Sequence, residues 1–331
     1  MAGVLLGFLL AVLCMAGFCG WLALTPYGPQ TETFVEIPNG SSSYAIGALL
    51  ETGGIIRSRY VFDLVRFVKR GTLHAGEYRF THPATVIEIY SRLVHADVYT
   101  RTLVIPEGAN LFDIATRVEQ AGLGSRQEFL DAARSQTALI SDLDPAATSL
   151  EGYLFPATYT FRHNTPATQM VALMVHRFRQ TAEQIGLTQN IHRTVTLASL
   201  VERETAVDAD RPLVASVFEN RLAKNMPLET DPSVIYGLER EGRWKGQLRS
   251  NELAEDTPYN TYRHTGLTPG PVANPGLPSL RAALKPAHTG YYYFVAAGAN
   301  AQGHSLFAAT LDEHNHNVAG YRRELRKAGL R

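Results

Sequence analysis

Two glutamates lie two positions apart in the apolar stretch Leu197–Ala206, and helical geometry would place them differently. A helix turns by about 100° per residue, so Glu204 would fall within about 60° of Leu197, Leu200 and Val201. A carboxyl group against aliphatic side chains loses hydration, which raises its pKa and lets it keep a proton near neutral pH. Such a group can act as a general acid on a glycosidic bond.

The second glutamate of the stretch, Glu202, would lie about 200° from Glu204 on the same helix. It would stand beside Val195, Ala198 and Ser199. These ten or so residues alone also allow a helix on which both carboxyl groups are solvated. The role of Glu202 therefore stays open between support of its neighbour and a solvated charge.

The composition narrows the kinds of function. With 331 residues and 45% apolar side chains, the chain can fill the cores of about two or three domains. Thirty-one basic residues balance thirty-one acidic ones, so no net charge attracts nucleic acid, and a neutral, hydroxyl-rich ligand fits better than a polyphosphate. Cys14 and Cys19 both lie in the N-terminal apolar run, which leaves no thiol elsewhere for disulfides, catalysis or a metal.

The N-terminal run, residues 2–25, contains no charged side chain, and Pro26 and Pro29 follow it. A helix of about 20 such residues spans a bilayer. The run is longer than the apolar region of a cleaved signal peptide and no clear A-x-A site follows it, so we predict an uncleaved anchor with a short linker over residues 1–28. Because no Lys or Arg precedes the run, its charges do not set the orientation.

Residues 29–105 predict a small α+β region. Phe34–Gly40 is typical of a strand that runs into a turn, and an amphipathic segment follows it. The same strand-turn-helix pattern returns at 103–123, near the boundary with the next domain. Between the two copies we expect helices over 60–68 and 86–94 and a strand over 76–80. Such units could bind glycan or could only hold the next domain away from the membrane.

Residues 106–331 predict a larger, mostly helical α+β domain. The Gly- and Pro-rich segment 266–276 must form a loop, and a Gly/Asn turn is expected over 298–303. Asp231 is a plausible helix cap. Met170, Leu173, Met174 and Phe178 are expected on one apolar stripe of a helix over 166–186. Further helices are expected around Glu204, from Pro212, from 230 and over 310–327, with strands at 291–295 and from His304.

Tyrosines and hydrogen-bonding side chains are frequent between residues 220 and 276. Tyrosine faces stack on sugar rings and amides bond hydroxyl groups, so the pattern favours a groove for a neutral polysaccharide. Each of these side chains could instead fill a core or hold a loop. The candidate substrate-binding residues are Asn220, Thr230, Asp231, Tyr236, Tyr259, Asn260, Thr261, Tyr262 and Asn274.

Three histidines near the C-terminus, His304, His314 and His316, do not predict a metal site. The sequence has no His-Glu-x-x-His motif, and His314 and His316 would point to opposite sides of a helix. His304 could donate a hydrogen bond in the groove or satisfy the core. We therefore expect no metal and no other cofactor.

A series of motifs together resembles the membrane-bound endolytic murein transglycosylases, also called the YceG-like family. The motifs follow one another in the same order over almost the whole chain, and this joint occurrence is specific although no single motif is. They are Glu151–Pro156, Leu197–Ala206, Val217–Leu222, Thr230–Gly237, Tyr259–Tyr262, Gly270–Gly276 and His304–Asn315. Thr268 departs from the family, which often has proline there, and the change affects loop stiffness only.

The resemblance implies a single-pass inner-membrane protein with a LysM-like region and a periplasmic YceG-like catalytic domain with a lytic-transglycosylase-like active-site helix. The implied reaction cleaves the bond between N-acetylmuramic acid and N-acetylglucosamine within nascent peptidoglycan strands, leaves 1,6-anhydro ends and limits strand length. The family's catalytic glutamate precedes the Thr of a Glu-Thr-Ala motif, which matches Glu204 here and not Glu202. Peptidoglycan synthases are implied partners.

Two other functions stay open on the residues alone. One is a hydrolytic muramidase with Glu204 as the acid and Asp231 or Glu202 as a second carboxylate. The other is a peptidoglycan-binding anchor without enzymatic activity. The masses of the reaction products distinguish the muramidase from the transglycosylase, and release of muropeptides distinguishes either from the anchor.

Overall fold

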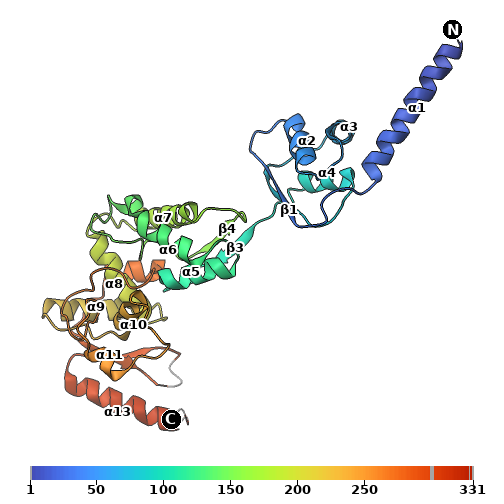
Figure 1. Ribbon diagram of the computed structural model, residues 1–331. Coiled ribbons are helices and arrows are strands. Elements are labelled where there is room, and N and C mark those ends of the chain that lie inside the picture. Colours follow the sequence, from blue (N-terminus) through green and yellow to red (C-terminus); the bar gives the residue numbers. More distant parts are fainter. Residues whose placement is uncertain (1, 299–301, 328, 330–331) are drawn as a thin grey trace. The chain divides into compact units, whose positions relative to one another are not determined.

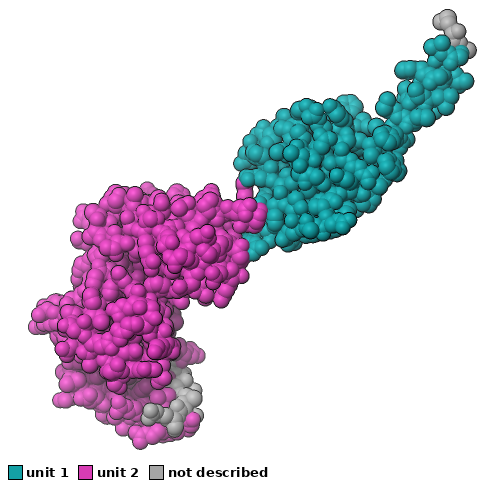
Figure 2. Space-filling model, viewed as in Figure 1, with its two compact units in different colours: residues 1–101 teal, residues 102–331 magenta. Residues whose placement is uncertain are grey.

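The computed structural model describes residues 2–298, 302–327 and 329 (Figure 1). Its contacts divide the chain into two compact units, Met1–Arg101 and Thr102–Arg331 (Figure 2). Within the described residues, helices dominate and the strands pair two by two. This confirms the α+β class, whereas the LysM-like nature of residues 29–105 and the domain boundaries stay predictions.

The first unit is built around a pair of antiparallel strands, β1 and β2, and short helices. Val35 lies opposite Tyr78 in the register of this sheet, and both side chains are buried with Leu50 and Phe62. In β1, buried Val35 and Ile37 flank exposed Glu36, as the period of two along a strand predicts. The elements are α1 (Ala2–Leu24), β1 (Thr33–Ile37), α2 (Ser43–Thr52), α3 (Arg59–Lys69), β2 (Gly76–Phe80) and α4 (Val86–Val94).

Local capping explains where the short helices begin. The Ser42 hydroxyl accepts a hydrogen bond from the Ala45 backbone N–H at 3.2 Å and so caps α2. Thr85 and Glu88 form a reciprocal capping box at the start of α4. These caps satisfy backbone groups that have no partner within the helix.

Helix α1 matches the predicted anchor in length and composition. Its segment Gly3–Leu24 has 22 residues and a mean hydropathy of 2.3, enough to cross a membrane. Large apolar side chains such as Leu5 and Phe8 are exposed along it, while Ala23 at its end packs into the core of the first unit.

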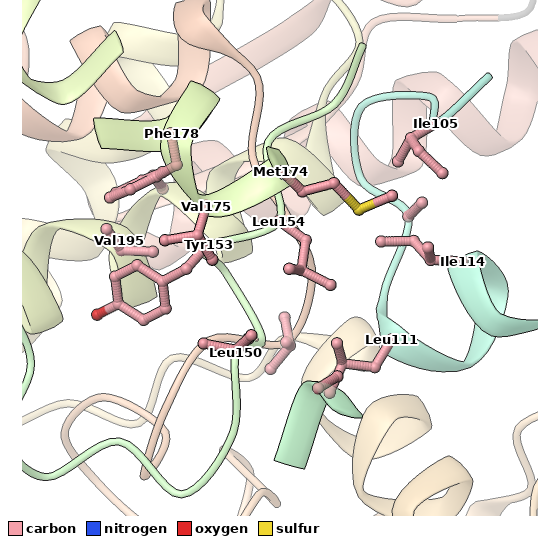
Figure 3. Close-up of a cluster of buried hydrophobic side chains, with 14 of the residues drawn as sticks. Ile105, Leu111, Ile114, Leu150, Tyr153, Leu154, Met174, Val175, Phe178 and Val195 are labelled. Atoms are coloured by element: carbon pink, nitrogen blue, oxygen red, sulfur yellow. The ribbon is translucent and has the colours of Figure 1, made fainter. Parts of the chain in front are cut away.

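The second unit has one continuous apolar core, to which α5, α7 and α8 contribute (Figure 3). Tyr153 and Phe178 meet edge to face, with ring centroids 5.1 Å apart. Helix α12 packs on both α8 and α9. The elements are β3 (Arg101–Val104), α5 (Leu111–Gln120), α6 (Arg126–Ser135), η1 (Thr137–Ile140), β4 (Thr158–Phe161), α7 (Ala167–Gln184), α8 (Ile191–Glu204), α9 (Arg211–Ala223), α10 (Asp231–Arg240), α11 (Ser250–Ala254), α12 (Leu277–Leu284), β5 (Tyr293–Ala296), β6 (Ser305–Ala308) and α13 (Leu311–Lys327).

The structure corrects two details of the prediction and leaves part of a third untested. Leu173 is 42% exposed, while Met174 and the other expected stripe residues of α7 are buried. Asp231 is the first residue of α10 and Thr230 occupies the cap position, so Asp231 is not the cap. Residues 299–301 of the expected turn lie outside the described residues.

Candidate active site

Glu204 is the last residue of α8, and the chain leaves the helix immediately after it. Thr205 is extended, with φ −143° and ψ 135°. The preceding residues Leu197, Leu200 and Val201 have no exposed surface, so core packing fixes the position from which the Glu204 side chain projects. The Glu204 side chain itself is half-buried.

Burial is the main cause that raises the pKa of Glu204, to about 7. The charge of Asp231 acts in the same direction, whereas Thr230, Arg203 and Arg221 oppose it. The negative end of the α8 dipole also disfavours a carboxylate at this position. A carboxyl group with a pKa near 7 can donate a proton and take one back at neutral pH.

The start of α10 faces this carboxyl group. The Tyr262 hydroxyl donates a hydrogen bond to Oδ1 of Asp231 at 2.7 Å. Burial raises the pKa of Tyr262, with a further contribution from Asp231, so the phenol keeps its proton. The Thr230 backbone N–H donates to Oγ1 of Thr261 at 3.0 Å. Four predicted site residues, Thr230, Asp231, Thr261 and Tyr262, are thus brought together beside Glu204.

The hydroxyl of Thr230 is buried beside Glu204 without a full hydrogen-bond partner among the described residues. Thr230 is 2% exposed, and within the described residues its Oγ1 has no partner that meets hydrogen-bond geometry. It still lies close enough to Glu204 to favour the charged form of that carboxyl group. A buried hydroxyl without a full partner is costly, so a ligand or a rotation of Glu204 would relieve it.

Arg221, which the sequence analysis did not select, positions the segment before Thr230. Its Nη1 donates to the carbonyl oxygens of Pro227 and Leu228 at 3.0 and 3.1 Å, and its Nε donates to the Tyr292 carbonyl at 2.7 Å. The guanidinium group thus joins α9 to two loops of the site. Its place in the Val217–Leu222 motif was the available signal.

Glu202 is buried in an ion pair and is not solvated, so that alternative is wrong. Its Oε1 lies 2.9 Å from Nη2 of Arg211, and only 4% of the Glu202 side chain is exposed. Its Oε2 accepts a hydrogen bond from the Gly276 backbone N–H at 2.8 Å. Both oxygens are used to join α8 to α9 and to the start of α12, which supports the site without facing it.

Three other predicted residues gather around Glu151. The Asn274 amide donates to Oε1 of Glu151 at 2.8 Å and its oxygen accepts from the Leu154 backbone N–H at 2.8 Å. The Tyr236 and Tyr259 rings meet edge to face with centroids 5.1 Å apart. Burial raises the pKa of Glu151 to about 8, and it also raises the pKa of Tyr236.

A cavity of about 430 Å³ opens beside this second cluster. On its wall, Oδ2 of Asp144 accepts a hydrogen bond from the Tyr153 hydroxyl at 2.8 Å. The same oxygen lies 2.7 Å from Nδ1 of His192. His192 stands twelve residues before Glu204 on α8, which corresponds to about 18 Å along the helix axis. Tyr236 and Tyr259 line this cavity, whereas Glu204 is not among its lining residues.

The remaining predicted amides have structural contacts. Asn260 is fully buried, and its amide donates to the carbonyl oxygens of Leu253 and Glu255 at 3.0 and 2.7 Å. Asn274 is likewise fully buried. The amide of Asn220 donates to the Thr289 and Tyr291 carbonyls. Irregular loops must satisfy buried backbone groups, and these amides do so here. Their part in substrate binding stays a prediction.

The histidines take part in packing. Nδ1 of His304 lies 3.1 Å from Oδ1 of Asp210, which also accepts from the Ser305 backbone N–H through its other oxygen. The His314 ring stacks on Tyr293, and burial lowers the pKa of His314. Among the residues that the structure describes, no three His, Cys, Asp or Glu side chains gather in a metal-binding arrangement.

Comparisons with known proteins show which family the chain belongs to. The chain matches the model of the YceG-like family over residues 35–320. It is 35% identical to an endolytic murein transglycosylase of Bacillus subtilis, over 86% of this chain and 84% of that protein. It is 30% identical to one of Streptococcus pneumoniae, over 94% of this chain but 63% of the longer relative. A crystal structure of a YceG-like protein from Listeria monocytogenes has a TM-score of 0.56 at 34% identity, over 87% of this chain and 99% of that one.

Proposed function

This chain belongs to the YceG-like family, and we propose that it is a lytic transglycosylase that cuts within the glycan strands of peptidoglycan. The observation that supports this most is the single half-buried carboxyl group at the end of α8, Glu204, with a pKa of about 7. The names of its relatives supply the substrate class.

In the proposed reaction, Glu204 first donates its proton to the oxygen between N-acetylmuramic acid and N-acetylglucosamine. The carboxylate then takes the proton of the muramyl C6 hydroxyl, whose oxygen attacks C1 of the same sugar. One C–O bond breaks, one forms, and no water is consumed. The product carries a 1,6-anhydro ring, and neither a metal nor a cofactor is needed.

Neighbouring groups suit this sequence of steps. Asp231, held by the Tyr262 hydroxyl, places a negative charge near the site and would stabilise positive charge that develops on the sugar ring. The Thr230 hydroxyl would orient Glu204 or accept a hydrogen bond from a sugar hydroxyl. Tyr236 and Tyr259 would contact glycan only at a distance from the cleaved bond.

A hydrolytic muramidase is the second candidate, because Asp231 lies near enough to Glu204 to raise its pKa. Glu202 does not suit the second carboxylate, since Arg211 and the Gly276 N–H occupy both of its oxygens. Incubating sacculi with the detergent-solubilised full chain tests all candidates. Muropeptides lighter by one water at their muramyl end support the transglycosylase, reducing ends support the muramidase, and no release supports a binding anchor.

The proposed location follows from the substrate. Helix α1 would cross the cytoplasmic (inner) membrane once and leave residues after it on the periplasmic side, where peptidoglycan lies. A role in limiting strand length, peptidoglycan synthases as partners and glycan binding by residues 29–105 stay predictions from the family resemblance.

A further inference from the structure

Helix α3 exposes large apolar side chains in the first unit. It buries Val61 and Phe62, yet Leu64, Phe67 and Val68 are 47%, 70% and 69% exposed. Tyr60 is exposed as well. The spacing of Tyr60, Leu64, Phe67 and Val68 places them along one side of the helix. A contiguous apolar face of this kind marks a contact with a membrane or another protein.

An apolar groove of about 600 Å³ lies between α3 and the membrane-anchor helix α1, which pack against each other. Apart from Lys69 at the end of α3, its lining residues are uncharged. From α1 it includes Phe8, Val12, Met15 and Cys19, and from α3 it includes Val61, Leu64, Val65 and Val68. The surface of the anchor and the exposed face of α3 are therefore continuous.

The end of α1 carries the residue types that anchor proteins at the edge of a bilayer. The guanidinium of Arg57 lies 5.5 Å from the centroid of the Trp21 ring and 5.0 Å from that of Tyr27. Tryptophan and tyrosine are enriched at the membrane–water interface. Arg57 stands two residues before α3, so α3 begins at the depth that these aromatic side chains mark.

Basic side chains follow the apolar face. Arg66, Lys69 and Arg70 at the end of α3 are all exposed, and the Arg70 guanidinium lies 5.9 Å from the Phe67 ring centroid. Long cationic side chains can lay their stems on apolar surface and place their charges among lipid headgroups. A positively charged cluster is attracted to anionic lipids.

We propose that the face of α3 formed by Tyr60, Leu64, Phe67 and Val68 lies in the bilayer interface beside α1. Acyl chains fill the groove between the two helices, and Arg66, Lys69 and Arg70 contact anionic headgroups. Lipid is the occupant that the structure favours, because the groove continues the surface of a helix that itself needs lipid. The inference rests on α1 crossing the membrane, and it fixes the first unit to the membrane surface.

Quenching by brominated lipid tests this in the full chain reconstituted in nanodiscs of phosphatidylcholine and phosphatidylglycerol. A Phe67→Trp reporter is placed in a background with both natural tryptophans, Trp21 and Trp244, changed to Phe. Leu173→Trp in the same background is the control, because Leu173 is an exposed apolar residue of the second unit. A third variant keeps Trp21 alone and reports whether α1 is in the bilayer.

We expect brominated acyl chains to quench the Phe67→Trp reporter and the Trp21 variant but not the Leu173→Trp control. If Trp21 is quenched but the Phe67→Trp reporter is not, the inference is overturned and the anchor stays intact. If neither tryptophan is quenched, the anchor and the inference are overturned together. Neither outcome bears on the Glu204 reaction. A reporter signal that changes only when two chains share a nanodisc assigns the face to a second copy and also overturns the proposal.

Charge reversal tests the headgroup contact. Arg66→Glu, Lys69→Glu and Arg70→Glu combined should lower quenching of the Phe67→Trp reporter about twofold or more in bilayers with phosphatidylglycerol. In pure phosphatidylcholine the same change should have little effect. An equal loss in both bilayers would contradict the role of anionic headgroups, and Lys285→Glu serves as a charge reversal in the second unit, which should leave the quenching unchanged.

Discussion

Glu204 and Glu151 are two carboxyl groups of the same unit whose pKa values burial raises, yet their surroundings differ. Glu151 is 3% exposed, and its two oxygens accept hydrogen bonds from the Leu111 backbone N–H and from Asn274. Glu204 stands half-buried at a helix end beside the incompletely partnered hydroxyl of Thr230. A raised pKa alone therefore does not identify a catalytic acid, and the use of the carboxyl oxygens separates the two roles.

The same substitution in both places should give opposite results. Glutamine keeps the shape of the side chain but cannot exchange a proton, and it replaces one acceptor oxygen by a donor. At Glu204 this removes the proposed chemistry, whereas at Glu151 it breaks an internal hydrogen bond.

Glu204→Gln should have the largest effect on activity. Because one group supplies both acid and base, we expect release of muropeptides from sacculi to fall about 10²- to 10⁴-fold. Glu219→Gln is the matched control, since Glu219 forms an exposed ion pair with Arg193 away from the site. Thermal unfolding verifies that both variants fold. Substantial activity in folded Glu204→Gln would remove this residue from the mechanism.

Glu151→Gln should have the largest effect on stability. One of the donors, the Leu111 N–H or the Asn274 amide, would face the new amide hydrogens and lose its partner, which costs about 1 to 3 kcal/mol. Denaturant unfolding at pH 6 measures this. Activity at a temperature where the variant is folded should stay near that of the wild type, and a selective loss of activity with unchanged stability would contradict the structural role.

The effect of Glu204→Gln on stability should depend on pH. The folded pKa of Glu204, about 7, lies above its ordinary value of 4.5, so folding favours the protonated form. Its contribution is fully present below pH 4.5 and is lost as the pH rises to about 7. Glu204→Gln should therefore be more stable than the wild type at pH 8, by about 1 kcal/mol after discounting for solvent, but not at pH 4. Unfolding at both pH values checks this, and a difference that is equal at both would contradict it.

Asp231→Asn should have the smallest effect, on the pH profile of activity. Removing a neighbouring negative charge lowers the pKa of Glu204, so the fall of kcat/KM on the alkaline side should begin at a lower pH. Activity at pH 6 should remain within about tenfold of the wild type. A loss as complete as that of Glu204→Gln would instead favour the two-carboxylate muramidase.

Periodicity and capping explain why much of the fold could be predicted. The strand Gly76–Phe80 and the helix Val86–Val94 have the predicted bounds, because alternation defines the strand and the Thr85–Glu88 box defines the helix start. Helical phase also selected Glu204. The end of α8 at Glu204 itself was missed, because the apolar pattern continues beyond the last helical residue.

Long-range pairing explains what could not be predicted. Glu151 and Asn274 are 123 positions apart, and no local pattern shows that they share a hydrogen bond. Asn274 was therefore placed in a groove together with Tyr236, although both surround a different carboxyl group. The ion pair between Glu202 and Arg211 was missed for a similar reason, since it forms only when α8 and α9 pack together.

Digestion of sacculi in water enriched in ¹⁸O tests the central claim most directly. If Glu204 directs the C6 hydroxyl to C1, mass spectrometry of the released muropeptides will show 1,6-anhydro ends without heavy oxygen, and Glu204→Gln will release far fewer of them. Muramyl reducing ends that carry ¹⁸O would show that water is the nucleophile and would contradict the account.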